Sequence, residues 1–434
     1  MSLGQEQIWL HSELAPEVPL YTESLTIRRN GMLDREALIA SFREIIRRHE
    51  IWRTTFSWSG GQLIQHVHPA GEPPIQVADL SHLPEDEREA SALQLATSDL
   101  RKPFVLSREP GVRAYLVTLS DRDHRLYLCL HHLVFDGISI YRVFLPELAA
   151  LYQARVSGTP STLAEPPIQY ADYAYWQRQG IDERAFAPLQ GYWRERLSGT
   201  TSMIDLPADH PRPRRQSFRG AMMRFELPAD LTAAVKKAAH REGCTLFMIL
   251  LASFSVALSC WTRQTEMVIG TVSGGRDEPE LQYLMGYFLR VLPIRSDLRG
   301  DPTFREILQR VRGVVLEALC NEALPFQRLV RAVDSQRDLG RSPLFQVTFS
   351  IEPPMPDLGP EWDLTEMDAG TSVSKFDLSI ELEDRGAVVT GRAIYSLDLF
   401  EASTVSEFLS DWTSLLRSAT SDPQQHLTDL VAQS

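Results

Sequence analysis

One apolar run constrains the fold more than any other stretch of this sequence. It is CTLFMILLASFSVALSCW, from Cys244 to Trp261. Such a segment has to leave water, either in a membrane or in the core of a large domain. It is slightly shorter than the about 20 residues that span a bilayer, contains several Ser and Thr residues, and stands alone. We therefore predict a buried helix in a globular domain, and no membrane association.

The composition agrees with a large core and disfavours polyanionic partners. The chain has 434 residues, of which 43% are hydrophobic and 23% charged, as in an ordinary globular protein of two or three domains. Its net charge of −13 disfavours binding to nucleic acid or to an anionic membrane. No CxxC pair and no signal-peptide pattern is visible, so we expect no disulfide framework, no structural zinc and a cytoplasmic location. The cysteines are Cys129, Cys244, Cys260 and Cys320.

Helical and strand-like patterns alternate along the whole chain, which indicates an α/β (α+β) fold class. Asp34 is a plausible N-cap for a helix that follows it, and Gly60-Gly61 joins two strand-like segments as a hairpin. The segment 157–169 is dense in Pro, Ser and Thr and is typical of a linker. Both halves mix helices and strands at a similar scale, so we predict two related domains of about 200 residues each. The expected helices include 85–98 and 230–242, and the expected strands include 111–119, 124–133 and 219–228.

Two histidines stand where a strand should enter a core, in LCLHHLVFDGIS (Leu128–Ser139). Successive side chains of a strand point to opposite faces, so His131 and His132 cannot serve the same surface. One should face the interior of its domain and the other a cleft, where a neutral imidazole suits general-base work near neutral pH. Asp136 could cap the next helix, orient a histidine or hold an arginine, and Gly137 allows a tight turn.

Two other interpretations of the pair stay open at this point. Both histidines could be satisfied structural residues, since buried polar groups usually find partners. A zinc or iron site is the other, because imidazole and carboxylate are common ligands. Adjacent strand residues diverge, however, and no third ligand is apparent, so no metal is expected.

HHLVFDG matches the HHxxxDG pattern of the condensation domains of nonribosomal peptide synthetases, which the whole chain resembles. This family is similar in fold to chloramphenicol acetyltransferase. Six further motifs of the family occur in order along the chain, which makes the resemblance much more specific than HHxxxDG alone. They are SLGQEQIWL (2–10), RHEIWRTTF (48–56), YADYAYWQ (170–177), MGYFLRVLPIR (285–295), NEALPFQRLV (321–330) and RDLGRSPLFQV (337–347).

The resemblance implies a fold, a domain division and a set of site residues. Two chloramphenicol-acetyltransferase-like halves, 1–170 and 171–434, would form a V-shaped pseudo-dimer with a tunnel between them. The C-terminal half would contribute floor-loop and latch crossovers. His132 would be the catalytic residue, whereas the other motif residues would be structural. These are His131, Gly137 and Asp136, with Arg276 from IGTVSGGR as the first choice of partner for Asp136 and Arg341 as the alternative.

The implied reaction transfers an acyl, peptidyl or polyketide chain to an acceptor amine or hydroxyl, forming an amide or an ester. The donor arrives as a thioester on the 4′-phosphopantetheine of an acyl or peptidyl carrier protein, and no bound cofactor or metal is needed. The acceptor is either on a second carrier or a free small molecule, which would make this a chain-release step. His132 could remove a proton from the acceptor, or position it and stabilise the tetrahedral intermediate. We expect a monomer.

Three departures from the family pattern bear on substrate choice. Ile138 stands where Trp is frequent, Arg290 where Asn is usual, and Gln327 where Glu is usual. The segments SPLFQVTFSIEPP (342–354) and SKFDLSIELED (374–384) most resemble members from mixed polyketide–peptide assembly lines. The basic segment HPRPRRQSFRG (210–220) could contact an acidic carrier or a phosphate, or could be a solvated loop.

Two competing functions stay open. The chain could be an acyltransferase that uses free acyl-coenzyme A, with the same histidine and a different donor. It could instead be a non-catalytic domain that binds carriers and gates their traffic, although such a domain needs no imidazole in a cleft. The chain could also be freestanding or one domain of a larger synthetase.

Overall fold

The protein is described by a computed structural model that forms two compact units. The structure describes residues 1–433 except 14, 181–182, 200–202, 334–339, 355, 357, 360 and 366–371. The first unit comprises Met1–Ile181, Arg276–Phe288 and Met355–Thr371. The second comprises Asp182–Gly275, Leu289–Pro354 and Ser372–Ser434. Each unit is a mixed α/β structure built around a sheet of its own, as the alternation of patterns predicts.

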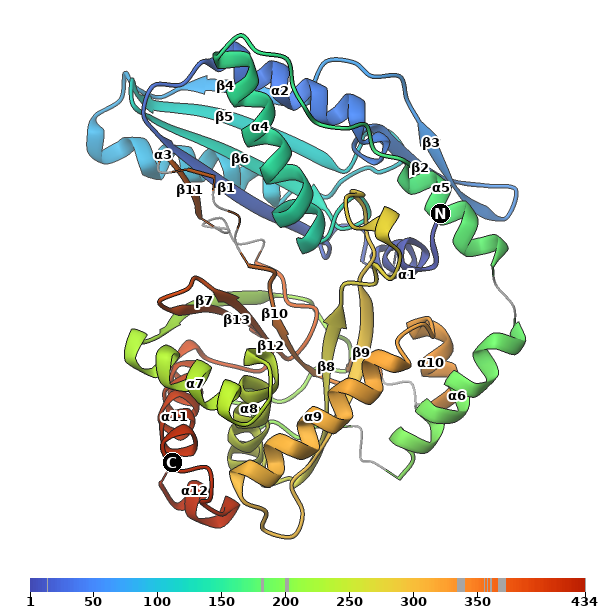
Figure 1. The fold of residues 1–434 in the computed structure, drawn as a ribbon, viewed down its shortest axis with the longest axis vertical. Helices are drawn as coiled ribbons and strands as arrows, with labels where there is room; N and C mark the ends of the chain where they lie inside the picture. Colours follow the sequence, from blue (N-terminus) through green and yellow to red (C-terminus); the bar gives the residue numbers. More distant parts are fainter. Residues whose placement is uncertain are drawn as a thin grey trace. The chain divides into compact units, whose positions relative to one another are not determined.

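The sheet of the first unit has the strand order β11-β1-β6-β5-β4. β1, β6 and β5 are antiparallel neighbours, whereas β4 runs parallel to β5. A separate hairpin pairs β2 with β3 across Gly60-Gly61, and both glycines have positive φ, which a tight turn of this kind requires. The elements of this unit (Figure 1) are α1 (Leu3–Ser12), β1 (Thr22–Asn30), α2 (Arg35–Arg48), η1 (Glu50–Arg53), β2 (Thr54–Ser59), β3 (Gln62–Val67), β4 (Ile75–Asp79), α3 (Glu85–Leu100), β5 (Val112–Ser120), β6 (Asp123–His131), η2 (Ser139–Phe144), α4 (Leu145–Val156), α5 (Tyr170–Gln179), η3 (Pro279–Leu281) and β11 (Trp362–Thr365).

Alternating side chains of β6 pack against the two faces of this sheet. Tyr127 and Cys129 lie in a buried cluster with Ala92 and Ala96 of α3. The residues between them, such as Leu128, point to the opposite face, where α2 and α4 lie (Figure 1). α2 begins where Asp34 accepts a hydrogen bond from the backbone N–H of Ala37, which confirms the predicted N-cap.

The second unit buries the apolar run identified in the sequence. α8 carries it: twelve of its residues are buried, and nine of these belong to one large hydrophobic cluster with the sheet β7-β13-β12-β10-β8-β9. The prediction of a buried core helix is therefore confirmed. The elements of this unit are α6 (Glu183–Leu197), β7 (Gly220–Leu227), α7 (Ala229–Arg241), α8 (Leu246–Thr262), β8 (Glu266–Ser273), β9 (Arg290–Asp297), α9 (Phe304–Cys320), α10 (Phe326–Val333), β10 (Val347–Ile351), β12 (Leu378–Asp384), β13 (Val389–Ser396), α11 (Ala402–Ser421) and α12 (Leu427–Gln433).

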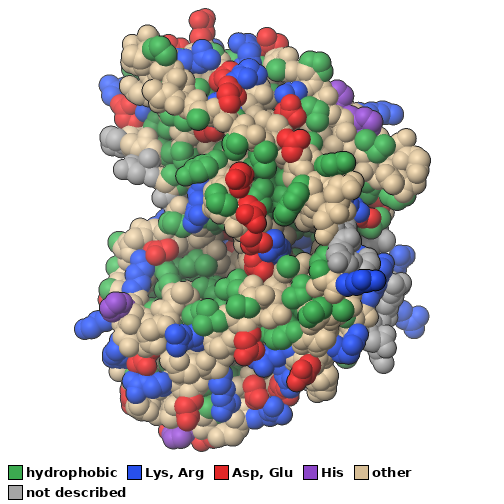
Figure 2. All heavy atoms as spheres, turned by 45° about the vertical axis from the view of Figure 1, so that its right-hand side comes forward, with side chains coloured by type: hydrophobic (Ala, Val, Ile, Leu, Met, Phe, Trp, Pro, Cys, Tyr) green, Lys and Arg blue, Asp and Glu red, His purple; other side chains and the backbone are tan. Residues whose placement is uncertain are grey.

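Among the described residues, no single helix has both the length and the apolar character of a membrane span. α7 and α8 reach that length and composition only as a pair, and the pair is bent by 107°. On the face drawn in Figure 2, acidic and basic side chains are mixed over most of the surface, with a short row of acidic side chains near the middle of the view.

Two segments from the later part of the chain belong to the first unit. The segment 276–288 follows β8, and 355–371 follows β10. The second segment contains β11, which pairs antiparallel with β1 from Thr26↔Thr365 to Arg29↔Trp362. The sequence pattern did not predict β11, because four residues are too few for a period of two to be visible.

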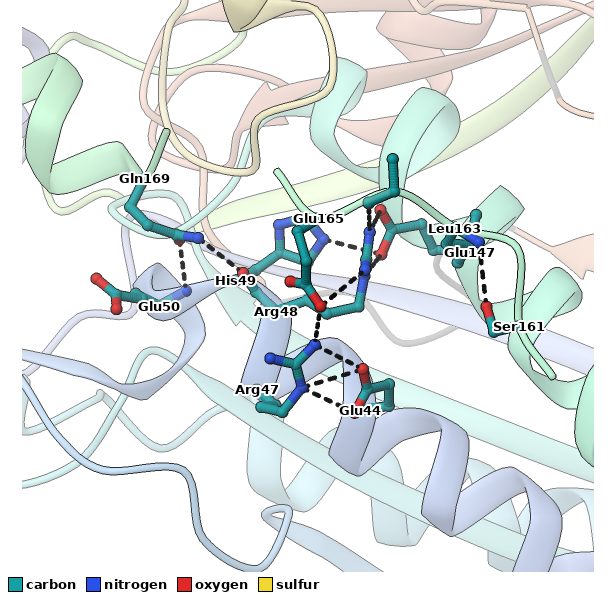
Figure 3. Close-up of polar contacts among 11 residues, drawn as sticks. Glu44, Arg47, Arg48, His49, Glu50, Glu147, Ser161, Leu163, Glu165 and Gln169 are labelled. Atoms are coloured by element: carbon teal, nitrogen blue, oxygen red, sulfur yellow. Dashed lines mark hydrogen bonds and ion pairs between the residues drawn. The ribbon is translucent and has the colours of Figure 1, made fainter. Parts of the chain in front are cut away.

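The predicted linker 157–169 has no helix or strand, as expected, but side chains hold it to the first unit (Figure 3). The Arg48 guanidinium donates to the backbone carbonyl of Ala164 at 2.6 Å. Gln169 accepts a hydrogen bond from the Glu50 backbone and donates to the carbonyl of Arg48. Arg48 also binds Glu147 of α4, so the end of α2 joins α4 to this segment.

Candidate functional site

The two histidines lie at the end of a central strand, as the sequence predicts. β6 ends at His131, whose backbone N–H donates to the carbonyl of Gly111 at 2.8 Å. The backbone N–H of His132 donates to the carbonyl of Tyr21 at 2.9 Å. Strand pairing with β1 therefore continues for one residue beyond β6, and the backbone of both histidines is held in place.

His131 is buried and packed against its neighbours. It is 5% exposed, and its Nδ1 accepts a hydrogen bond from the backbone N–H of Leu133 at 3.2 Å. Its ring packs edge-to-face with Phe104. An imidazole whose Nδ1 accepts a backbone hydrogen bond is neutral, with its proton on Nε2.

His132 is the more accessible histidine, with 16% of its side chain exposed. Its ring stacks on Phe135 with 4.7 Å between centroids and 3° between planes, and Tyr287 and Tyr21 lie edge-on to it. Its Nδ1 lies 3.5 Å from the carbonyl oxygen of Phe135, which can only accept. This contact favours a proton on Nδ1 and leaves a lone pair on Nε2, the arrangement that a general base requires.

A carboxylate faces the other nitrogen of His132. Oε1 of Glu23 lies 3.6 Å from Nε2, and the Glu23 side chain is 23% exposed. Glu23 comes from β1, where it pairs with Leu130 of β6. Nε2 of His132 therefore has a carboxylate oxygen close to it, and both side chains are partly exposed.

Asp136 and Arg276 form a fully buried ion pair close to His132. Two guanidinium nitrogens of Arg276 each lie 2.8 Å from a different oxygen of Asp136, and the two side chains are 2% and 0% exposed. The carboxylate also accepts hydrogen bonds from the backbone and hydroxyl of Ser139 and from the backbone N–H of Phe288. The remaining guanidinium N–H groups donate to the carbonyls of Leu281 and Leu284 and to Ser139.

This pair connects the HHxxxDG segment to the segment 276–288. Arg276, which was predicted first as the partner of Asp136, is the arginine that binds it. Arg341, the predicted alternative, belongs to the second unit. The Ser139 hydroxyl oxygen also accepts a hydrogen bond from the backbone N–H of Gly286, and it lies 2.8 Å from the carbonyl oxygen of Gly286, which competes with Asp136 for the single hydroxyl proton. The 276–288 segment is therefore held through both side chains and backbone.

Gly286 occupies a position that a larger residue could not. Its φ is +151°, and a Cβ built there would lie 1.9 Å from the Tyr170 ring. The Tyr170 hydroxyl donates to the carbonyl of Tyr287 and also contacts the Ser2 hydroxyl at 2.9 Å. Burial raises the pKa of Tyr170 far above its ordinary value, so its hydroxyl keeps its proton. These contacts place Tyr287 beside His132.

The other residues singled out in the sequence lie in varied places. Gly137 does not have a positive φ; it starts the helical segment that continues as η2. Ile138 is half-buried, and Arg290 pairs with Glu322 at 2.8 Å in the second unit. Gln327 lies at the start of α10. The first three residues of the RDLGRSPLFQV motif, 337–339, lie outside the described residues.

The basic segment 210–220 divides into two parts. Arg212 forms a bidentate pair with the buried Asp377 at 2.9 and 2.5 Å, so it is structural. Arg214, Arg215 and Arg219 are exposed, as in a solvated loop.

Cys129 is the thiol nearest to this site in the sequence. It is buried in the cluster that packs against α3, and burial raises its pKa to about 12. A thiol with this pKa is protonated at neutral pH and is a poor nucleophile. The thiol of Cys129 is therefore not available as a nucleophile or base for this site.

Solved structures place the chain in a fold class. The X-domain from teicoplanin biosynthesis superposes with a TM-score of 0.84 and 27% identity, covering 99% of this chain and 96% of that one. The SgcC5 protein from Streptomyces globisporus does so with a TM-score of 0.82 and 27% identity, covering 98% and 99%. The mixed α/β class predicted from the sequence is thereby confirmed.

Sequence comparison identifies the family. The model named Condensation domain matches residues 1–434. Phosphinothricin tripeptide synthetase PhsC of Streptomyces viridochromogenes is 39% identical over 433 residues, which is 99% of this chain and 40% of that protein. A linear gramicidin synthase protein of Brevibacillus parabrevis is 38% identical over 433 residues, 99% of this chain and 6% of that protein. The chain belongs to the condensation-domain family of nonribosomal peptide synthetases.

Members of this family transfer acyl or peptidyl groups and form amide bonds between substrates held on phosphopantetheine-bearing carrier domains. The chain is therefore an acyl-transferring enzyme of this class. It spans less than half the length of these two curated relatives.

Several residues of the site escaped the sequence analysis. Ser139, Gly286 and Tyr170 lie within or beside the family motifs, but no pattern indicated that they contact one another. Glu23, in contrast, breaks a pattern that is visible in the sequence. It stands in YTESLTI on the same face of β1 as the buried Leu25 and Ile27, where alternation calls for an apolar residue.

Proposed function

We propose that His132 is the general base of a condensation reaction between an acyl thioester and an acceptor amine. The observation that supports this is the state of its ring: the contact with Phe135 favours a proton on Nδ1 and leaves Nε2 able to accept one. An amine must lose a proton to form an amide, and a base positioned within hydrogen-bond distance contributes about 10²–10⁴-fold in rate.

In the proposed reaction the amine nitrogen attacks the thioester carbonyl and a C–N bond forms. Nε2 of His132 accepts a proton from that nitrogen. The C–S bond of the tetrahedral intermediate then breaks, and the leaving pantetheine thiolate takes up the proton from the imidazolium. Atoms and charges balance without an external reductant, metal or nucleotide, because the thioester supplies the driving force.

The remaining site residues have structural roles in this proposal. His131 holds the strand end, and the Asp136–Arg276 pair anchors the segment that brings Tyr287 to the imidazole. Gly137 starts the following helix. We further propose that the chain consists of halves 1–170 and 171–434, with α5 at their junction belonging to the first compact unit, 276–288 as the floor-loop crossover and 355–371 as the latch.

The proposed partners are a donor acyl or peptidyl carrier protein and either an acceptor carrier or a free small amine. Resemblance of 342–354 and 374–384 to mixed assembly lines favours a polyketide-like donor. We propose that the chain acts as a monomer in the cytoplasm and needs no bound cofactor of its own.

The test is intact-protein mass spectrometry of a carrier loaded with a short acyl chain. The loaded carrier is incubated with wild type or His132→Ala and a mixed pool of amine and hydroxyl acceptors. We expect the wild type to unload the carrier and form a new amide, and His132→Ala to lose at least about 100-fold in rate. His131→Ala is not a suitable control because it removes a buried side chain; Glu72→Gln, an exposed change, is.

Other outcomes select the alternatives. An ester as the main product would mean that a hydroxyl is the acceptor. If free acyl-coenzyme A is consumed while the carrier stays loaded, the donor assignment is wrong. If wild type binds the carrier but turns over neither donor, the domain gates carriers and does not catalyse.

A further inference from the structure

The carboxylate of Glu23 lies at a position where strand alternation calls for an apolar residue. On β1, Glu23 shares a face with Leu25 and Ile27, which are 5% and 1% exposed. Across the antiparallel pair it lies opposite Leu130, which is 1% exposed. Placing a charge at the end of such a row is costly unless a partner compensates it. A residue that breaks a local pattern in this way often serves a functional site.

Strand register directs this side chain toward His132. Glu23 of β1 pairs with Leu130 of β6. His132 lies two residues after Leu130 and on the same face, so it is the diagonal neighbour of Glu23. Diagonal neighbours on one face lie about 7–8 Å apart, within reach of a long side chain. The result is the 3.6 Å approach of Oε1 to Nε2. The backbone N–H of His132 donates to the carbonyl of Tyr21, so strand pairing fixes the position of His132 relative to Glu23.

The two atoms that face each other are both hydrogen-bond acceptors. The contact of Nδ1 with Phe135 leaves a lone pair on Nε2, and an ionised carboxylate only accepts. A separation of 3.6 Å is less than twice a hydrogen-bond length of about 2.9 Å, so one donor nitrogen can contact both atoms. A primary ammonium group offers three N–H donors and a positive charge that complements the carboxylate.

We propose that Glu23 binds the ammonium form of the acceptor and delivers it to Nε2 of His132. The acceptor is then a primary amine that enters protonated, rather than a hydroxyl compound. The ammonium gives one proton to Nε2, which releases it to solvent, and the neutral amine remains between the two side chains to attack the thioester. The Glu23 carboxylate keeps its charge throughout and stabilises the imidazolium. This inference rests on the proposed function and assigns the residue that binds its amine acceptor.

The inference is tested by equilibrium binding without a donor, so that no turnover is required. Isothermal titration calorimetry compares alanyl-pantetheine and lactyl-pantetheine whose thioester is replaced by an amide. These probes differ only in an ammonium or a hydroxyl group. We expect wild type to prefer the ammonium probe at least tenfold, and Glu23→Gln to lose that preference with little change for the hydroxyl probe. Glu23→Asp, shorter but still charged, should retain part of it.

Glu72→Gln is the matched control, since it removes an exposed carboxylate from the same unit. Thermal melting of each variant shows whether it is folded. The inference is overturned if wild type binds the ammonium probe no better than the hydroxyl probe, or if Glu23→Gln weakens both equally. The carrier-unloading assay decides the proposed function separately: condensation by wild type together with an unchanged preference in Glu23→Gln would reject only the inference.

Discussion

Two carboxylates in the first unit, one fully buried and one partly exposed, are held by arginines in different ways. Asp136 is 0% exposed, and both of its oxygens are bound by Arg276, Ser139 and the Phe288 backbone. Glu147 is 12% exposed and is bound by Arg48 and His49 (Figure 3). The first pair joins segments far apart in the sequence beside the candidate base. The second joins α2, α4 and the segment 157–169.

The two ion pairs differ in how deeply they are buried and in which segments they hold together. A charge that is fully removed from water depends entirely on its partners, because water cannot replace a lost hydrogen bond. A partly exposed carboxylate can recover some hydration when a partner is removed. The Asp136–Arg276 pair should therefore be the more sensitive of the two, although neither need add net stability relative to apolar residues of similar size.

The largest expected effect comes from breaking the Asp136–Arg276 pair. We expect Arg276→Leu to lower the free energy of unfolding by about 3–5 kcal/mol, because it leaves the Asp136 charge buried without its cation. Urea denaturation followed by tryptophan fluorescence measures this loss. Condensation activity should fall with it, so low activity in this variant would not identify Arg276 as catalytic.

The double variant Asp136→Leu/Arg276→Leu sharpens this result. It removes both charges, so it should be less destabilised than the sum of the single variants, with a coupling of about 0.5–3 kcal/mol. Arg276→Lys keeps the charge but not the two-pronged geometry, and should be intermediate. Unchanged urea midpoints in all three variants would contradict the importance that we assign to this pair.

Much of this site was visible in the sequence, and the reasons are specific. Strand alternation separated His131 from His132. The HHxxxDG motif contains Asp136, and the family resemblance indicated Arg276 as its partner. The helix of Cys244–Trp261 was identifiable because its apolar character leaves few alternatives. Strand alternation and apolar character are local patterns that depend only on neighbouring residues along the chain, whereas the choice of Arg276 came from the family resemblance.

The contacts that the sequence did not reveal are those between distant segments. Gly286 approaches Tyr170, and β11 pairs with β1, but each needs the whole first unit to bring its partners together. Glu23 could be recognised only as a break in an apolar row. The atom it faces depends on strand register, which one sequence does not display.

The second pair gives a smaller effect with a pH dependence. Burial by itself would raise the pKa of Glu147, but hydrogen bonds from His49 and Arg48 outweigh burial and hold this pKa below its ordinary value. A carboxyl with a depressed pKa stabilises the fold above its unfolded pKa of about 4.3, and that contribution is lost as the pH falls through the lower folded value. We expect Glu147→Gln to cost about 1–3 kcal/mol at pH 7.

The comparison of wild type with Glu147→Gln at several pH values tests this sign. Their urea midpoints should differ at pH 7 and converge as the pH falls below about 4. If the difference between the two urea midpoints instead grows as the pH falls, then Arg48 and His49 do not stabilise the ionised form of Glu147. Arg276→Leu serves as the contrast, since it should remain the weaker protein at pH 7.

The smallest effect is expected for an ion pair on the surface of the same unit. Arg43 contacts Glu72 at 2.6 Å, yet the two side chains are 46% and 82% exposed. Water and salt screen such a pair, and holding two long side chains together costs conformational entropy. We expect Arg43→Ala to change the free energy of unfolding by no more than about 0.5 kcal/mol. A loss as large as that of Glu147→Gln would mean that burial does not set the ranking of these pairs. A small loss would instead support burial as the property that separates the anchor beside His132 from the ion pairs at the surface.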